Sequence, residues 1–281
     1  MADHVPSHGF ATLDMPIPRL SEGRFASCAF LTDDALYDAV GVRIAFTQRT
    51  GGTSAAPFDT LNLGSHVDDD PSCVQENRRR VLAALGAQHA ALIAPNQVHG
   101  SVLVGCAAPE EAPACAERAQ QGADGVIVTC RDVAALLCFA DCVPVVAVSP
   151  AGSFAVVHAG WRGVVAHIAE AAVRALCEAD GVPASSLNVY LGPHIRGCHF
   201  EVGPEVAARF VDEFGPCALR PDGHADMAAA LAAGLRGCGV DAARIADAGV
   251  CTVCDAGSRY YSYRASGGRC GRHAAVAVRV S

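Results

Sequence analysis

The sequence predicts a mixed α/β protein built around a single domain. Short apolar runs bounded by turn residues, which are typical of buried strands, alternate with segments in which apolar residues recur every three or four positions, which are typical of helices. No linker, change of composition or internal repeat divides residues 41–281, and we therefore expect one domain there. Residues 1–40 are interrupted by prolines and weakly periodic, and we expect a partly ordered extension or a first hairpin.

Each element is predicted from a local pattern. Residues 42–47 are an apolar run of strand length, and the step from Asp70 to Pro71 marks a helix start, because proline is tolerated in the first helical turn. Apolar residues three or four positions apart over 165–176 predict another helix. The stretch 107–121 is rich in Ala, Pro and Glu, and we expect a surface loop there. Further strands are expected at residues 125–128, 134–139, 144–149, 154–158, 188–191 and 274–280, and further helices from Pro204 and Met227.

The composition excludes several kinds of chemistry. With 51% hydrophobic and 18% charged residues, the chain can bury a large core. All 21 basic residues are arginine, so that no lysine is present to form a Schiff base, to anchor pyridoxal phosphate or to complete a Gly-Lys-Ser/Thr phosphate loop. The formal charge of −8 also argues against a nucleic-acid partner, which would require a basic groove.

The cysteines and the start of the chain bear on the cellular compartment. Fourteen cysteines are dispersed through a long chain, unlike the dense framework of a short secreted domain. The opening sequence MADHVPSHGF has neither a basic start nor an apolar run. No stretch reaches the ~18 apolar residues of a membrane span. We therefore expect a reduced, cytoplasmic protein without a membrane partner.

Three residues of metal-ligand type lie at or beside the ends of apolar runs. They are His99, Cys142 and His158, and their separations of 43 and 16 residues match no local zinc-finger pattern. Two imidazoles and one thiolate suit Zn²⁺, and three protein ligands leave a fourth position for water or substrate. Each residue taken alone also fits a packing or hydrogen-bonding role.

Longer strings connect these residues to a known family. The chain contains NQVHG, ADGVIVT, FADCVPV, VHAGWRG and GPHIRGCHFEVG, preceded by FTQRTGG and LNLGSHVDDDP and followed by CT…YYSYR…GR. These strings closely resemble, over residues 42–280 and in order, the family long labelled multicopper polyphenol oxidase or laccase-domain proteins. The resemblance implies a four-layer α/β/β/α sandwich of mixed sheets, similar to that of a bacterial toxin deamidase domain that uses a Cys–His pair.

The same resemblance implies a function and a ligand set. Family members are understood as zinc-dependent purine nucleoside enzymes, which phosphorolyse adenosine, inosine, guanosine and methylthioadenosine and deaminate adenosine. The family's metal ligands fall on His99, Cys142 and His158. Zinc lowers the pKa of water that binds to it and so supplies a nucleophile for deamination at C6 of adenine.

The older family name implies copper chemistry, which the histidines do not favour. A multicopper oxidase uses many His-x-His pairs, because one strand then supplies two coppers of a cluster. The chain has 11 histidines and not one His-x-His pair. A built-in copper cluster is therefore not expected. Cu²⁺ could still enter a His₂Cys site, because copper exceeds zinc in intrinsic affinity, and weak phenol oxidation would then reflect metal loading.

Two carboxylates are candidates for moving protons. Deamination requires a group that serves the ring nitrogen and the leaving amine. Asp141 stands beside the ligand Cys142, and Glu201 lies in the string FEVG. Either carboxylate could instead orient ligands or bond the backbone.

Phosphorolysis requires an anion site, and arginine is the cation available in this chain. The planar guanidinium group binds oxyanions through two parallel hydrogen bonds. Arg49, Arg162 and Arg264 lie inside the family-like strings, with surface ion pairs as the alternative role. Arg162 is expected at a helix start, where free backbone N–H groups favour anions. Asn62 and Gln97 are candidates for contacts to the ribose or base.

Other features receive weaker interpretations. The CxxC pair 251–254 has no second CxxC, and we favour a packing role for it. His194 and His199 flank a Gly-Cys turn and are candidates for a second metal site. His66 is interpreted as a hydrogen-bonding loop residue, and Trp161 as a packing residue that could alternatively stack on a base.

Several functions remain open from the residues. The favoured hypothesis is a zinc enzyme of purine nucleoside phosphorolysis and adenosine deamination. A second is a hydrolase or deamidase in which Cys142 is the nucleophile and His158 or His99 the base. The others are a copper-loaded polyphenol oxidase and a non-catalytic binding module stabilised by zinc.

Overall fold

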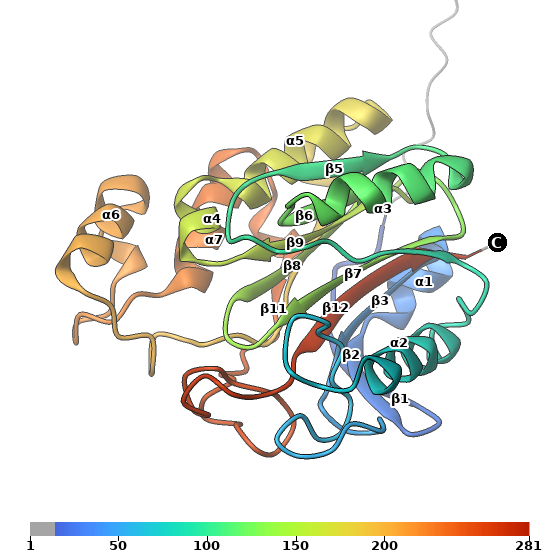
Figure 1. Cartoon of the computed structure of the whole chain (residues 1–281). Coiled ribbons are helices and arrows are strands. Elements are labelled where there is room, and N and C mark those ends of the chain that lie inside the picture. The colour runs from blue at the N-terminus through green and yellow to red at the C-terminus, as the bar shows by residue number, and fades with distance from the viewer. Residues whose placement is uncertain (1–14, 281) are drawn as a thin grey trace, which may run out of the picture.

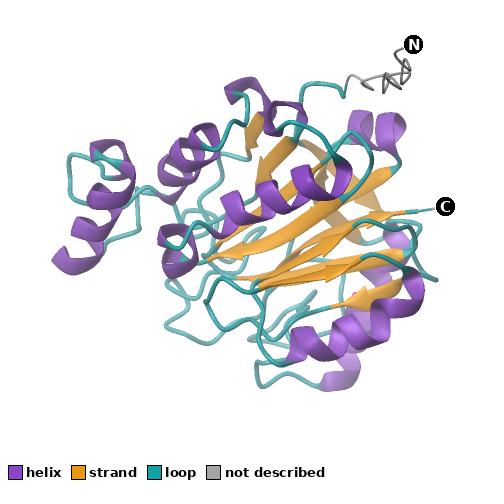
Figure 2. Cartoon of the chain, turned by 90° about the horizontal axis from the view of Figure 1, so that it is seen from above, coloured by secondary structure: helices purple, strands orange, loops and turns teal. Residues whose placement is uncertain are grey.

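The computed structural model describes residues 15–280 and has four layers (Figure 1). Two mixed β-sheets of six strands each pack face to face, and helices cover their outer faces. Viewed from above, the strands lie in the interior and the helices at the periphery (Figure 2). The predicted mixed α/β fold in one domain, arranged as α/β/β/α, is therefore confirmed.

The first sheet has the order β1-β2-β3-β12-β7-β4. Its neighbours are antiparallel except for the edge pair β4 and β7, which is parallel. The C-terminal strand β12 lies in the middle of this sheet, where it pairs with both β3 and β7. The strands are β1 (Ser21–Phe25), β2 (Cys28–Thr32), β3 (Val42–Thr47), β4 (Ala91–Ile93), β7 (Val133–Phe139) and β12 (His273–Arg279).

The second sheet has the order β11-β10-β8-β9-β6-β5. The two edge pairs are parallel and the three inner pairs antiparallel. Strands β7 and β8 are consecutive in the chain but belong to different sheets, so the turn that joins them crosses from one sheet to the other. The strands are β5 (Leu103–Cys106), β6 (Gly125–Val128), β8 (Val143–Val148), β9 (Phe154–Ala159), β10 (Asn188–Leu191) and β11 (Ile245–Asp247).

Alternate residues of the strands face different apolar layers. In β7, Leu137 and Phe139 point into the core between the sheets, whereas Leu136 and Cys138 point toward the outer face. This period of two explains why the central strands are apolar throughout, because each is buried on both sides.

The helices cover the sandwich on three sides. Helix α2 packs on the outer face of the first sheet, α5 and α7 on that of the second, and α1 and α3 border the core between the sheets. Helix α6 lies farther out at one end (Figure 1). The helices are α1 (Asp34–Val40), α2 (Pro71–Ala84), α3 (Ala112–Gln120), α4 (Trp161–Val165), α5 (Ile168–Asp180), α6 (Pro204–Phe214) and α7 (Met227–Gly237).

Most of the predicted elements are present, with two differences. Helix α2 starts at Pro71, where the side chain of Asp70 accepts the N–H of Ser72, as the sequence predicts. The prediction of a surface loop over 107–121 is wrong: a 3₁₀ turn (Pro109–Glu111) runs into α3. Both prolines of that stretch lie in first helical turns, where their missing N–H removes no hydrogen bond.

The single helix expected over 165–176 is divided. Helix α4 ends at Val165, and α5 begins at Ile168 after His167, whose φ of 56° lies in the left-handed region. His167 bridges Glu170 and Glu213 through its two ring nitrogens, which holds the break in place. The apolar spacing continues across this break and therefore conceals it.

The segment before Val40 contributes to the fold. Strands β1 and β2 form a hairpin, which was one of the two expectations for residues 1–40. Leu31 of β2 and Leu36 of α1 are buried in the core between the sheets. Residues 1–14 lie outside the described part of the chain. No helix of the described residues is long and apolar enough to cross a membrane.

Candidate metal and substrate site

His99, Cys142 and His158 meet at one end of the sandwich. His99 lies in the loop after β4, Cys142 in the turn that crosses from β7 to β8, and His158 in β9. Their potential ligand atoms all lie within 4.8 Å of one another. Ligand atoms that share one zinc ion lie at most ~4.6 Å apart, because each bond is ~2.0–2.3 Å long. The three side chains are therefore close to a coordinating arrangement, although they are far apart in the sequence.

The buried carboxylate of Asp124 organises the two histidines. Its Oδ1 atom lies 2.8 Å from Nδ1 of His158 and accepts the backbone N–H of His99 at 2.9 Å, while Oδ2 accepts the N–H of Gly100 at 2.7 Å. This bond occupies Nδ1 of His158 and leaves its Nε2 atom for a metal. Asp124 also restrains the loop at His99, whose φ of 59° is in the left-handed region. Burial disfavours the charged carboxylate, but the bonds from His158 and Gly100 outweigh it and lower the pKa of Asp124.

Gly160 leaves room for the side chains of His99 and Cys142. A Cβ atom at this position would lie 3.1 Å from Cδ2 of His99 and 3.3 Å from Sγ of Cys142. Both contacts are tighter than ordinary van der Waals distances, so a larger residue would push the ligands apart.

Cys142 and His158 shift each other's pKa toward the charged forms. Burial raises the pKa of the Cys142 thiol, but the neighbouring His158 and His99 outweigh this effect and lower it to about 6. Burial likewise lowers the pKa of His158, but Cys142 and the bond to Asp124 raise it to about 9. Between these two values the pair is a thiolate and an imidazolium. The thiolate is the form of cysteine that binds metals and attacks electrophiles.

We expect Cys142 of the metal-free chain to react with iodoacetamide at a rate that rises with a midpoint near pH 6. Its depressed pKa keeps the thiolate populated above that pH, and protonation removes it below. Peptide mass spectrometry of alkylation against pH measures this rate. Cys138, which lines the same cavity and whose pKa is raised by burial, is the internal control and should react more slowly at neutral pH. A midpoint for Cys142 at the ordinary thiol value of 9.0 would contradict this electrostatic account.

His99, Cys142 and His158 line a cavity of about 460 Å³. Asp141 and Gln97 line it as well, but both are engaged in the protein. Asp141 accepts the hydroxyl of Thr252 at 2.6 Å and the backbone N–H of Arg264 at 2.7 Å. Gln97 donates to the carbonyl of Cys138 and accepts its N–H, both at 2.8 Å. The lining residues are His66, Gln97, His99, Cys138, Ala140, Asp141, Cys142, His158, Ile195, Phe200, Tyr263, Arg264 and Arg272.

Of the three arginines predicted as phosphate contacts, the structure brings only Arg264 to the cavity. Arg49 is paired with Asp59 at 3.0 Å and stacks on Tyr261. Arg162 is exposed and lies over the ring of Trp161, with its guanidinium carbon 4.4 Å from the ring centre. The guanidinium group of Arg264 reaches two backbone carbonyls at 3.4 Å.

Of the other residues that the sequence analysis considered, some line the cavity and others lie away from it. Asn62 is fully buried away from the cavity, where its amide bonds Gly64, Asp69 and the backbone N–H of Arg272. Glu201 does not line the cavity either, and Trp161 packs against the outer helical layer. His66, in contrast, lines the cavity, and burial together with nearby arginines lowers its pKa.

Several residues of the site escaped the sequence analysis, among them Asp124, Arg272 and Tyr263. Asp124 stands in the string ADGVIVT, and the signal was a carboxylate directly before a buried strand. Arg272 and Tyr263 lie in the C-terminal string and line the cavity, with the guanidinium carbon of Arg272 5.6 Å from the centre of the Tyr263 ring. Both belong to irregular segments, in which no periodicity indicates where a side chain points.

Comparison with known proteins gives a consistent result. The family described as multi-copper polyphenol oxidoreductase laccase matches residues 43–280. A purine nucleoside phosphorylase of Pseudomonas aeruginosa is 40% identical over 243 residues, which are 84% of this chain and 92% of the relative. A purine nucleoside phosphorylase of Deinococcus radiodurans is 36% identical over 83% of this chain and 87% of the relative.

Solved structures agree with this assignment. The crystal structure of YlmD from Geobacillus stearothermophilus superimposes with a TM-score of 0.83 at 29% identity, covering 92% of this chain and 99% of that one. A Neisseria meningitidis protein superimposes with a TM-score of 0.74 at 28% identity, over 93% and 99% of the two chains. Together with the family match over residues 43–280 of this chain, these similarities show that the chain belongs to the multi-copper polyphenol oxidoreductase laccase family.

Proposed function

We propose that the chain is a zinc-dependent purine nucleoside phosphorylase that cleaves adenosine, inosine, guanosine and methylthioadenosine with phosphate, and that it also deaminates adenosine. The observation that carries this proposal is the convergence of His99, Cys142 and His158 in a cavity that two arginines also line. The names of the curated relatives, purine nucleoside phosphorylases at 36% and 40% identity, support the substrate class.

The donor set fits a catalytic zinc ion. A thiol whose pKa is already low and a histidine with Nδ1 held by a carboxylate are ready to bind a divalent ion without large rearrangement. Three protein ligands leave one position open, as in catalytic zinc sites. When bound, zinc would supply Lewis acidity and a water-derived nucleophile at neutral pH. Among the described residues, the group whose potential ligand atoms lie within 4.8 Å of one another at this site consists of these three side chains.

The chain's own residues would bind and orient the two reactants. In phosphorolysis an oxygen of hydrogen phosphate forms a bond to C1′ of the ribose as the bond from C1′ to the base breaks. The proton that the phosphate loses is balanced by the proton that the departing base gains on a ring nitrogen. Arg264 and Arg272 are the cations beside the ligands that suit phosphate. The aromatic rings of Phe200 and Tyr263 offer apolar faces for the purine.

Asp141 acts in this proposal as a positioning residue. Both oxygens of its carboxylate already accept hydrogen bonds, from Thr252 and from the backbone N–H of Arg264. These bonds fix the turn that carries Cys142 and tie it to the segment that carries Arg264. The arrangement supports the orienting role for Asp141 rather than proton transfer.

We expect Arg264→Ala to raise the KM for phosphate by about 10- to 100-fold, since a charge-assisted hydrogen bond contributes about 1.5–3 kcal/mol. The KM for the nucleoside should change much less. Arg162→Ala is the matched control, because this arginine lies in a family-like string but outside the cavity. Steady-state phosphorolysis of inosine at varied phosphate measures both effects. An equal loss in the two variants would rule out a specific phosphate contact by Arg264.

The proposed function is tested by the products formed from adenosine. Zinc-loaded protein is incubated with adenosine, with and without phosphate, and the products are separated by chromatography. Inosine formed without phosphate indicates deamination, and free adenine or hypoxanthine formed only with phosphate indicates phosphorolysis. The absence of all these products at every metal loading would overturn the proposal.

A second candidate is favoured by one observation. Cys142, His158 and Asp124 form a chain of thiolate, imidazolium and carboxylate, which is also the arrangement of a cysteine nucleophile with its oriented base. A hydrolase or deamidase of this type would be active without metal, and bound zinc would inhibit it. Activity of metal-free and zinc-loaded protein therefore separates the two candidates.

A further inference from the structure

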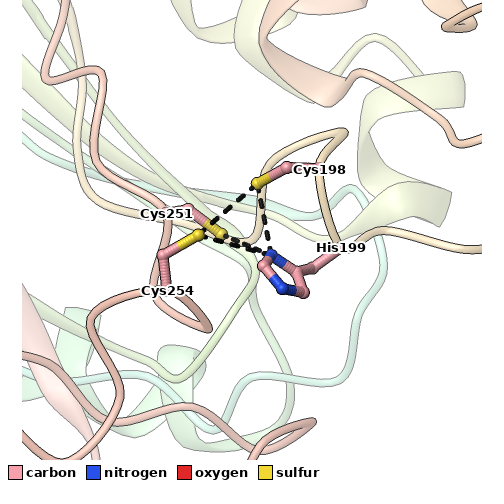
Figure 3. Close-up of side chains that lie close together, drawn as sticks. All are labelled: Cys198, His199, Cys251 and Cys254. Carbon is pink, nitrogen blue, oxygen red and sulfur yellow. Dashed lines mark hydrogen bonds between the residues drawn. The ribbon is translucent and has the colours of Figure 1, made fainter.

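Four more side chains of metal-ligand type meet outside the cavity. This Cys/His cluster consists of Cys198, His199, Cys251 and Cys254 (Figure 3). Cys198 and His199 lie in the loop between β10 and α6, and the two other cysteines lie about 50 residues later in the loop after β11. Figure 3 shows the three sulfur atoms gathered around one edge of the imidazole ring.

The four printed distances within the cluster lie within about 0.4 Å of those of a tetrahedral zinc site. Nδ1 of His199 lies 3.2, 3.6 and 3.4 Å from the sulfur atoms of Cys198, Cys251 and Cys254, and the sulfur atoms of Cys198 and Cys254 are 3.7 Å apart. Bonds of ~2.3 Å to sulfur and ~2.0–2.1 Å to nitrogen, at tetrahedral angles, place two sulfurs ~3.8 Å apart and a sulfur and a nitrogen ~3.6 Å apart. The sulfur atoms are too far apart for a disulfide, whose bond is ~2.05 Å.

We propose that the Cys/His cluster holds a second zinc ion, in a closed site with four protein ligands that serves structure rather than catalysis. Three thiolates and one imidazole are a donor set that zinc prefers, and four protein ligands leave no position for substrate. The proposal does not depend on the function proposed above.

The backbone around the cluster supports a built site. The segments containing the ligands are joined directly, because the N–H of His194 donates to the carbonyl of Val250 and the N–H of Thr252 donates to the carbonyl of His194. His194 itself is buried and directs Nδ1 to the carbonyl of Gly192, so it is not part of the cluster.

A zinc ion in the cluster would stabilise one wall of the cavity. Ile195 and Phe200, on either side of the first pair of ligands, line the cavity. Thr252 lies between the two later cysteines and donates to Asp141, the neighbour of Cys142. The second metal would therefore join the loop between β10 and α6 to the loop after β11, and both loops contact the first site.

A third group of possible ligands does not share these features. Cys106, Glu111 and Cys115 also lie close together, but each of the two thiols donates to a backbone carbonyl. We therefore expect zinc in the cluster but not in this third group.

The test measures metal content in a background without the first site. Cys142→Ser, loaded with zinc under reducing conditions and dialysed, should retain about one zinc ion per chain, as expected for a closed tetrahedral site. Adding Cys254→Ser should remove that ion, whereas the variant with Cys217→Ser added should keep it. Cys217 is exposed like Cys254 but bonds only the carbonyl of Phe214, which makes it the matched control. Zinc content is measured by elemental mass spectrometry.

Two further readouts identify the ligands and the role. Co²⁺ in the same Cys142→Ser background should give the intense visible and thiolate charge-transfer bands of a tetrahedral site, and these bands should be absent with Cys254→Ser. Chelation should lower the melting temperature of Cys142→Ser but not that of the Cys142→Ser/Cys254→Ser double variant. Equal zinc content in all three variants, or none in Cys142→Ser, would overturn the proposal. Failure of the proposed function would instead appear as inactive wild-type protein with zinc still in the cluster.

Discussion

Cys142→Ser is expected to lower kcat/KM for inosine phosphorolysis by at least about 10³-fold, with the fold retained. Serine has nearly the shape of cysteine, so the half-buried turn between β7 and β8 should remain intact. Its neutral hydroxyl is a poor zinc ligand, however, because it lacks the soft thiolate that the lowered pKa of Cys142 provides. Phosphorolysis kinetics and the metal content of the same preparation measure the effect.

The control for this prediction is a cysteine outside the first site and outside the Cys/His cluster. Cys217→Ser changes an exposed thiol and should leave activity and metal content at wild-type values. A Cys142→Ser protein with unchanged activity would contradict a role for this residue as a ligand. Loss of activity in Cys142→Ser, combined with full activity of the metal-free wild type, would favour the cysteine-nucleophile mechanism instead.

Asp124→Asn is expected to weaken metal binding at the first site by about 10- to 100-fold, as is typical when the partner of a histidine ligand is changed. It should also lower the free energy of unfolding by about 2–4 kcal/mol. Both oxygens of Asp124 face N–H donors, from His158 and His99 on one side and Gly100 on the other. In either orientation, the NH₂ group of an asparagine would therefore face an N–H donor, and neither group would have an acceptor.

Zinc titration and urea denaturation of Asp124→Asn measure these two effects separately. Asp222→Asn is a suitable control, because it changes an exposed aspartate that pairs only with its neighbours Arg220 and His224. If Asp124→Asn bound zinc as tightly as the control, Asp124 would not orient the ligands.

The regular elements were largely predictable from the sequence. Strands such as β6 and β8 are short apolar runs between turn residues, and the start of α2 is marked by Asp70 and Pro71, so local physics determines them. The strand order was not predictable, because β12 enters the middle of the first sheet through contacts with strands over 100 residues away in the sequence. No local pattern encodes such pairing.

The candidate sites show the same division. The three candidate ligands of the first site were predicted through the family-like strings and their positions at strand ends, but Asp124, which bonds the two histidines, was missed. Of the Cys/His cluster, only His199 was predicted as a metal ligand, and its predicted partner His194 is not part of the cluster. Cys251 and Cys254 were interpreted as packing residues, since no second CxxC is present. The remaining ligands are the adjacent pair Cys198 and His199, which the bridge between His194 and Cys251 brings alongside.

Anomalous X-ray scattering at the zinc absorption edge, from crystals of zinc-loaded protein, tests the central claim most directly. The account predicts an ion ~2.0–2.3 Å from His99, Cys142 and from Nε2 of His158, with no fourth protein ligand. An ion absent from this position in zinc-replete crystals, or one closed there by a fourth side chain, would contradict it.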